Sequence, residues 1–186
     1  MNIQITGASG SGKTYLGRKL AKKIEYEFVD VDDLIWVWDE DIQPYTMSVS
    51  TEVACEKLEK ILLNNEGIVA SGIYYPWAEK LIDYFDLLIV VETDDKIRKK
   101  RLIKREYKMY GNRAKKGGDM FEQFNRFLNW AMSYEYSQSI SGSRFETDKW
   151  ALKFEDRVLY IDGSWTLYKK IKVIQKKLRS LKKLLI

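Results

Sequence analysis

Short, continuously apolar runs alternate along the chain with longer segments in which apolar residues recur every three or four positions. The runs predict strands at residues 2–6, 28–31, 68–70, 87–91 and 157–161. The periodic segments predict helices over residues 15–24, 51–63, 94–107, 119–136 and 165–186. Continuously apolar strands that alternate with helices are typical of a parallel sheet covered on both faces. The pattern therefore predicts an α/β fold of three layers, in which helices enclose a central parallel sheet.

The last predicted helix has one apolar face. Its apolar residues are spaced by four, three, four, three and four positions, and most of its lysines fall on the other faces. These apolar residues are Leu167, Ile171, Ile174, Leu178, Leu181 and Leu185. We expect this face to pack on the sheet, and the alternative is that the helix lies on a membrane or on an acidic partner.

Composition limits the chemistry that the chain can carry out. Its 186 residues are enough for one domain with a full core, and none of them is histidine. A Ser-His-Asp triad and every histidine-ligated metal site are therefore excluded. The single cysteine, Cys55, excludes an internal disulfide and favours a reducing compartment. Because no apolar run is long enough to span a bilayer and the N-terminus does not resemble a signal peptide, we expect a cytoplasmic protein without a membrane span.

The net charge of +5 is unevenly distributed. Residues 96–116 carry eleven Lys or Arg and one Glu, and residues 167–186 carry eight Lys or Arg and no acid. The rest of the chain is therefore acidic. The first basic segment ends in a glycine-rich stretch at 108–118, which predicts a flexible basic loop.

Residues 7–14, Gly-Ala-Ser-Gly-Ser-Gly-Lys-Thr, match the phosphate-loop pattern G-x-x-x-x-G-K-[ST] between a predicted strand and a predicted helix. Glycines allow backbone amides to surround the β-phosphate, and the helix N-terminus adds its dipole. Lys13 can reach the β- and γ-phosphate oxygens, and the Thr14 hydroxyl can ligate Mg²⁺. The loop therefore predicts binding of a nucleoside triphosphate with Mg²⁺. The residues expected to hold it are Gly7, Ser9, Gly10, Ser11, Gly12, Lys13 and Thr14.

Three further motifs follow the loop in order. They are Asp30-Val31-Asp32-Asp33-Leu34-Ile35-Trp36, Arg101-Leu102-Ile103-Lys104-Arg105 and Tyr160-Ile161-Asp162-Gly163-Ser164-Trp165. With the phosphate loop, this order resembles the small kinases related to adenylate kinase and shikimate kinase, and most closely the topology-modulation or adenylate-kinase-like proteins. The resemblance implies one P-loop kinase domain over residues 1–186 that uses ATP and Mg²⁺. It also implies an acceptor-binding region at about 33–66 and a lid at about 106–120.

The acidic motif supplies the carboxylates that phosphoryl transfer needs. Following the shikimate-type pattern, Asp30 is expected to join Thr14 around Mg²⁺, and Asp32 to orient and deprotonate the acceptor hydroxyl. Residues two apart in an extended segment face the same side, which would place Asp30 and Asp32 together. Asp33 would then point away.

The basic residues are expected to act on the triphosphate. The resemblance implies that Arg101 stacks on the adenine and that Arg105 reaches phosphate, while Arg113 and Arg126 supply closing contacts. The predicted catalytic cations are therefore Lys13, Arg105, Arg113 and Arg126. The segment expected to wrap the adenine consists of Asp162, Gly163 and Ser164.

Two departures from the family pattern bear on the acceptor. Nucleoside monophosphate kinases usually carry Asp-Gly after the third strand, where this chain has Ser71-Gly72. They also carry an arginine there that holds the acceptor phosphate, and residues 73–95 contain none. A nucleoside monophosphate acceptor is therefore less favoured. The predicted substrate-binding residues are Asp32, Trp36, Gly72 and Tyr74, and the alternative for the aromatic ones is a place in the core.

The sequence predicts a kinase that transfers the γ-phosphoryl group to a small acceptor, either a nucleoside or nucleotide or a small hydroxyl metabolite. One alternative is a nucleic-acid-associated ATPase or end kinase, in which residues 96–116 bind a polyanion and Tyr107 and Tyr110 stack on bases. The other is a nucleotide-binding regulator without transfer activity. A lid is favoured over a nucleic-acid surface because the basic segment follows the phosphate loop in the expected order. The acceptor and the oligomeric state are left open.

Overall fold

A five-stranded parallel sheet lies at the centre of the computed structural model, which describes residues 1–39, 45–138 and 142–184. The strands are β1 (Ile3–Thr6), β2 (Glu27–Asp30), β3 (Ile68–Ser71), β4 (Leu87–Glu92) and β5 (Val158–Asp162). Their order is β2-β3-β1-β4-β5, so the chain crosses over β1 between β3 and β4. Ligands of open α/β sheets bind at the carboxyl ends of the strands where the order reverses. The predicted three-layer α/β fold is confirmed.

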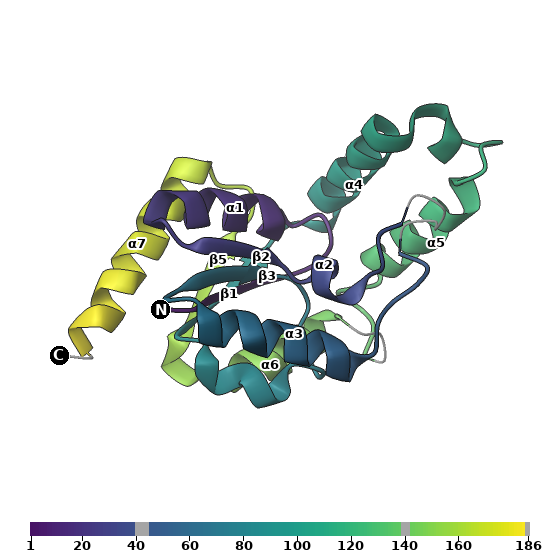
Figure 1. The fold of residues 1–186 in the computed structure, drawn as a ribbon. Helices are drawn as coiled ribbons and strands as arrows, with labels where there is room; N and C mark the ends of the chain where they lie inside the picture. The colour runs from purple at the N-terminus through teal and green to yellow at the C-terminus, as the bar shows by residue number, and fades with distance from the viewer. Residues whose placement is uncertain (40–44, 139–141, 185–186) are drawn as a thin grey trace.

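Helices cover both faces of the sheet (Figure 1). On one face lie α1 (Lys13–Ile24) and α7 (Leu167–Leu184), and on the other lie α3 (Thr51–Asn64), the 3-10 helix η1 (Glu79–Tyr84) and α6 (Arg144–Leu152). Strand β4 shows why the strand sequences are continuously apolar. Leu88 and Val90 belong to the core cluster under α3 and α6, whereas Ile89 and Val91 belong to the cluster under α1 and α7. Each fully buried aliphatic side chain of this kind contributes about 1.5–3 kcal/mol.

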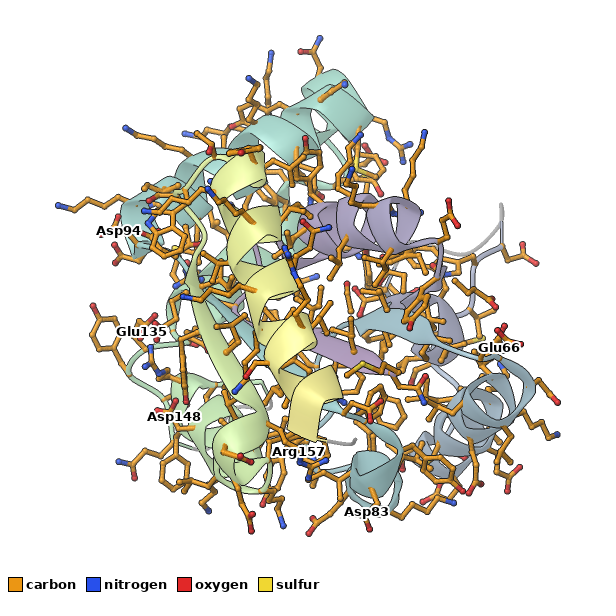
Figure 2. All side chains as sticks on the ribbon, turned by 90° about the vertical axis from the view of Figure 1, so that its left-hand side faces the viewer. Glu66, Asp83, Asp94, Glu135, Asp148 and Arg157 are labelled. Atoms are coloured by element: carbon orange, nitrogen blue, oxygen red, sulfur yellow. The ribbon has the colours of Figure 1, made fainter. Side chains whose placement is uncertain are left out.

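Helix α7 packs its apolar stripe on the sheet, as predicted. Ile174 is fully buried, and Leu167, Ile171, Leu178 and Leu181 join the same cluster. Leu185 lies outside the described residues. Figure 2 shows α7 across this side of the molecule, with Arg157 near its C-terminal end. Within the part of the chain that the structure describes, no helix is long and apolar enough to cross a membrane.

A helical hairpin projects beyond the carboxyl ends of the strands (Figure 1). It consists of α4 (Asp95–Tyr110), the 3-10 helix η2 (Gly111–Ala114) and α5 (Phe121–Met132). The helix predicted to begin at Asp94 is capped by that residue, since its carboxylate accepts from the backbone amides of Lys96 and Ile97 at 2.9 and 3.3 Å. Its two helices are joined by an aromatic contact, in which Tyr107 meets Phe124 edge-on with ring centres 6.2 Å apart.

Three sequence expectations about this region need correction. Residues 108–118 were expected to form a flexible loop, but α4 continues to Tyr110 and η2 follows. The next helix was expected to begin at Asp119, but the Asp119 carboxylate accepts two hydrogen bonds from Arg113 Nε and a third from Nη2. The cap residue of α5 is Met120, and the helix ends at Met132 instead of near Tyr136. Elsewhere, α2 (Asp32–Ile35) and α6 are helices in parts of the chain for which the sequence predicted neither helix nor strand.

Candidate functional site

The phosphate loop connects β1 to α1 at the carboxyl end of the sheet. Gly10 and Gly12 have φ of +81° and +96°, a left-handed backbone that glycine adopts without steric cost. A Cβ on Gly7 would lie 2.4 Å from the carbonyl oxygen of Val91, so β4 also requires glycine there. The N-cap residue of α1 is Gly12, which has no side chain that could cap the first amides. These amides are therefore available to an anion at the positive end of the helix dipole.

Two side chains from outside the loop hold the carbonyl group of Ser11. Thr93 Oγ1 donates to the carbonyl of Ser11 at 3.1 Å, and Arg101 Nη1 donates to the same oxygen at 3.0 Å. Arg101 Nη2 also donates to the carbonyl of Gly163 at 3.1 Å. The Arg101 guanidinium thus joins the phosphate loop to the turn after β5. Its predicted stacking on adenine stays a prediction, while its hydrogen bonds give it a second role that the sequence did not indicate.

The turn after β5 is tightly packed against the loop. A Cβ on Gly163 would lie 1.8 Å from Thr93 Oγ1, so only glycine fits. Asp162 accepts from the backbone amide of Ser164 at 2.7 Å, which closes the turn. Lys170 of α7 is buried and donates to the carbonyl of Gly163 at 2.8 Å. Burial lowers the pKa of Lys170, and nearby Arg101 lowers it further. In the sequence, Lys170 was one of many lysines of the last helix.

Arg98 is a second buried cation that sequence reasoning missed. It has no exposed surface, and its Nη1 donates to the carbonyls of Ser9 at 3.3 Å and Ala131 at 2.9 Å. Its guanidinium carbon lies 5.4 Å from the ring centre of Tyr134. Among the described residues, no hydrogen-bond partner meets its Nε or Nη2. Arg98 therefore connects the phosphate loop to α5 through the interior.

Lys13 of the loop lies close enough to the two aspartates of the acidic motif for their charges to act on it. Burial lowers the pKa of Lys13, and Asp32 and Asp30 are the charges that act most strongly in the opposite direction. Burial raises the pKa of Asp30. The charges of Asp32 and Asp33 raise it further, and the Arg18 guanidinium, 3.6 Å from the Asp30 carboxylate, opposes the rise. The segment is not extended as expected, because α2 begins at Asp32. Both carboxylates nevertheless lie on the side of Lys13.

The oxygen atoms at the ends of β2 and β3 fit a magnesium ion. Asp30 and Ser71 are register partners on neighbouring strands, and Ser71 Oγ donates to Thr14 Oγ1 at 3.2 Å. Ser71 is fully buried. Among the described residues, no group of three or more His, Cys, Asp or Glu could enclose a metal. The oxygen atoms of Thr14, Asp30 and Ser71 suit Mg²⁺, which is commonly held by one or two protein oxygens, by water and by substrate phosphates.

A cavity of about 710 Å³ opens beside Lys13 and the acidic motif. Four predicted site residues besides Lys13 and Ser9 line it: Asp32, Trp36, Arg105 and Arg126. Its volume is in the usual range for small-molecule sites, about 300–1,000 Å³. One wall comes from the segment around α2 and α3, and the other comes from the α4–α5 hairpin.

Three of the residues predicted to bind the acceptor or to close over the site do not line this cavity. Tyr74 is only 1% exposed and stacks between Trp77 and Trp150 at ring distances of 6.3 and 6.4 Å, so it belongs to the core. Gly72 is buried, and a Cβ there would lie 2.5 Å from Val31 Cβ, so its role is close packing. Arg113 is exposed and pairs with Asp119.

Other cavity residues were not predicted. Tyr110, Phe127 and Trp130 reach the cavity from the hairpin, and Trp77 reaches it from the segment before η1. The apolar spacing of residues 120–131 was visible in the sequence, but such a stripe indicates burial without saying against what.

Comparison with known proteins agrees with this geometry. Residues 3–121 match the family described as an AAA domain. The protein YqaC of Bacillus subtilis (strain 168), described as uncharacterized, is 32% identical over 170 residues, which cover 91% of this chain and 93% of that protein. The adenylate kinase isoenzyme 6 homolog of Dictyostelium discoideum is 30% identical over 115 residues, 59% of this chain and 63% of that protein. A shikimate kinase of Francisella tularensis subsp. holarctica is 31% identical over 81 residues, 37% of this chain and 46% of that protein.

Solved structures share the fold at low sequence identity. A gluconokinase from Sinorhizobium meliloti 1021 has a TM-score of 0.51 at 16% identity, covering 98% of this chain and 92% of that chain. A deoxyadenosine kinase from M. mycoides has a TM-score of 0.52 at 17% identity, covering 96% of this chain and 100% of that chain. The phosphate loop, the parallel sheet and these relatives agree. The chain belongs to the AAA-domain family that its residues 3–121 match, and to the small P-loop kinase-like group that includes the adenylate kinase and shikimate kinase relatives.

Proposed function

We propose that this protein is a kinase that uses ATP and Mg²⁺ to phosphorylate a small acceptor in the cavity. One observation carries the proposal: Lys13 of the phosphate loop and Asp32 of the acidic motif line the same cavity. A triphosphate on the loop and an acceptor in the cavity would meet beside a carboxylate. Kinase-named relatives support the same reaction class.

Phosphoryl transfer asks the protein mainly for positioning and charge neutralisation. Lys13 and the loop amides would bind the β- and γ-phosphate oxygens, while Thr14 and Asp30 would hold Mg²⁺. The bound ion would neutralise charge that develops on the phosphate oxygens. Arg105 and Arg126 would approach the transferring group from the hairpin. Asp32 would orient the acceptor hydroxyl and accept its proton.

In this proposal, the α4–α5 hairpin acts as a lid over the site. Residues 106–120 would cover the phosphates, and residues 33–66 would hold the acceptor. In support, Glu106, Tyr110 and Met120 line the cavity opposite Trp36 and Thr51. Closure of such an element over the site would exclude water from the reaction. The free, buried thiol of Cys55 suits the reducing cytoplasm in which we place the enzyme.

Asp32 allows a direct test with a matched control. Asp32→Asn should lower the transfer rate by about 10²–10⁴-fold, the range for loss of a general base. Its dissociation constant for ATP should change less than about threefold, because the loop that binds phosphate is intact. Asp33→Asn is the control, because Asp33 is the neighbouring acid, is exposed and does not line the cavity. Equal transfer by Asp32→Asn and wild type would refute the assignment.

Nucleotide binding is measured separately by thermal shift. ATP with Mg²⁺ at 100 times its dissociation constant should stabilise the wild type by about 2.7 kcal/mol. Lys13→Met should lose most of this shift while keeping its own unfolding transition. A full shift with ATP, together with no ADP release for any acceptor offered, would contradict the kinase and identify a nucleotide-binding protein without transfer activity.

A further inference from the structure

The cavity beside the phosphate loop is walled by aromatic rings on two opposing sides. Trp36, Tyr45 and Trp77 contribute from the sheet side, and Tyr110, Phe127 and Trp130 contribute from the hairpin. These rings come from four separate stretches of the chain: the segment from Trp36 to Tyr45, the segment before η1, the end of α4, and α5. Rings that face a site from two sides bind flat ligands by stacking and exclude water from them.

The rings are arranged to leave faces for a ligand. Trp36 and Tyr45 meet at 79° with ring centres 5.6 Å apart, and Phe127 and Trp130 meet at 33° with centres 5.8 Å apart. Neither pair is a parallel stack. One face of Trp77 is stacked on Tyr74 at 16°, and the Arg105 guanidinium carbon lies over the Phe127 ring at 5.7 Å. Trp36 and Trp130 are each only half-buried, so both walls keep ring surface that is open to a planar group.

Beyond Lys13, the charges that line the cavity balance. Its remaining charged lining residues among those described are two arginines, Arg105 and Arg126, and two carboxylates, Asp32 and Glu106. The Arg105 guanidinium carbon lies 5.7 Å from the ring centre of Phe127, at the aromatic wall. Two arginines accompanied by two carboxylates are a poor site for a dianionic phosphate group, which proteins usually bind with several cationic donors.

We propose that the acceptor is an uncharged planar ring compound that carries a free hydroxyl, and that nucleosides are its chemical class. This inference rests on the proposed kinase function of the same site. The ring would lie between the two aromatic walls, and its hydroxyl would point to Asp32. The hydroxyl oxygen forms a bond to the γ-phosphorus of ATP, and the bond from that phosphorus to the β,γ-bridging oxygen breaks. The hydroxyl proton passes to Asp32 and then to solvent, and ADP leaves.

A matched pair of ligands tests the charge of the acceptor. Binding of the four common ribonucleosides and of their 5′-monophosphates is measured by calorimetry, with Mg²⁺ and a non-hydrolysable ATP analogue at saturation to fill the donor site. At least one nucleoside should bind about tenfold or more tightly than its own monophosphate, since the phosphate would leave water without adequate partners. Glycerol, which has hydroxyls but no ring, should not bind in the same range. Tighter binding of the monophosphates, or no binding of any nucleoside, would overturn the inference.

Two tryptophans test whether stacking provides the affinity. Trp36 and Trp38 both contact the Tyr45 ring edge-on, at 5.6 and 5.0 Å, but only Trp36 lines the cavity and Trp38 is 48% exposed. Trp36→Ala should raise the nucleoside dissociation constant about tenfold, as expected for loss of one stacking ring. Trp38→Ala should change it less than about twofold. Trp130→Leu, in the other wall, gives an independent measurement if Trp36→Ala does not fold. Equal nucleoside affinities for Trp36→Ala, Trp130→Leu and Trp38→Ala would contradict the inference.

ADP release separates this inference from the kinase function itself. If a monophosphate or a polyol is phosphorylated faster than every nucleoside, the kinase function is supported and the inference about the acceptor is wrong. If nucleosides bind as described but none is phosphorylated, the aromatic site is supported and the kinase function is wrong. If a nucleoside both binds and is phosphorylated, the two proposals stand together.

Discussion

The guanidinium of Arg98, which has no exposed surface, donates a hydrogen bond from Nη1 to the carbonyl oxygen of Ser9 at 3.3 Å. The same nitrogen donates to Ala131 at the end of α5 at 2.9 Å. One buried side chain thus fixes the phosphate loop to the helix that carries Arg126 and Trp130 toward the cavity. This connection predicts that Arg98 contributes to nucleotide binding without touching the nucleotide.

Arg98→Met should lower the free energy of unfolding by about 1–3 kcal/mol, because two carbonyls lose their buried donor. The loss is limited because the substitution also removes a buried charge that lacks a carboxylate partner among the described residues. The dissociation constant for ATP should rise more than in Lys100→Met, a matched change at an exposed cation of the same helix. Denaturant titration and calorimetry measure the two effects, and equal ATP affinities in both variants would exclude a positioning role.

Asp30→Asn should make the protein more stable at neutral pH while it weakens Mg²⁺-dependent activity. Burial, with Asp32 and Asp33, raises the pKa of Asp30, so the folded state holds this proton more tightly than the unfolded chain. Stability of the wild type therefore falls as the pH rises above the ordinary carboxyl pKa, and the asparagine variant avoids that loss. We expect the free energy of unfolding to rise by about 0.5–2 kcal/mol, the usual range for a stabilising substitution.

The pH profile of that gain checks its cause. It should shrink below about pH 4, where the carboxyl is protonated in both states. Asp33→Asn, at an exposed neighbour, should give a smaller and flatter difference. A gain that is independent of pH would show that ionisation of Asp30 is not its source.

Arg101→Ala should raise the KM for ATP about tenfold or more, since hydrogen bonds from a charged donor contribute about 1.5–3 kcal/mol. The physical reason is that the loop carbonyl of Ser11 and the turn carbonyl of Gly163 lose their shared donor. The value of kcat should change much less, because no predicted proton transfer involves this side chain. Lys104→Ala removes another exposed cation of α4 and is the control in steady-state kinetics. An equal effect of both substitutions would indicate only a loss of general positive charge.

Trp150→Phe tests the core under α6 without touching the site. Trp150 Nε1 donates to Gln4 Oε1 at 2.5 Å, and both side chains are buried. Removing the donor leaves the amide of Gln4 without this partner, which should cost about 1–3 kcal/mol. Thermal unfolding should then begin about 2–4 °C lower for each kcal/mol lost in a chain of this size. Trp38→Phe at an exposed position should leave the transition unchanged.

Local patterns were sufficient where the chemistry itself is local. The phosphate loop is eight consecutive residues whose glycines, Lys13 and Thr14 have one well-defined use, so its place between β1 and α1 could be predicted from the sequence. The strands and the stripe of α7 could be predicted for the same reason, since burial on one or two faces leaves a period in the sequence. The Asp94 cap is likewise a local interaction.

Only the tertiary structure decided which similar residues do different things. Trp36 lines the cavity and Tyr74 is in the core, although both are aromatic, follow strands and were predicted to bind the substrate. Arg98 is buried and Lys99 beside it is exposed, although both belong to one basic run. A side chain's surroundings depend on elements far away in the sequence, here the return of α5 over α4 and of α6 under β1. The sequence by itself therefore determined the fold class and the phosphate loop, whereas the shape and lining of the acceptor cavity followed from packing between distant segments.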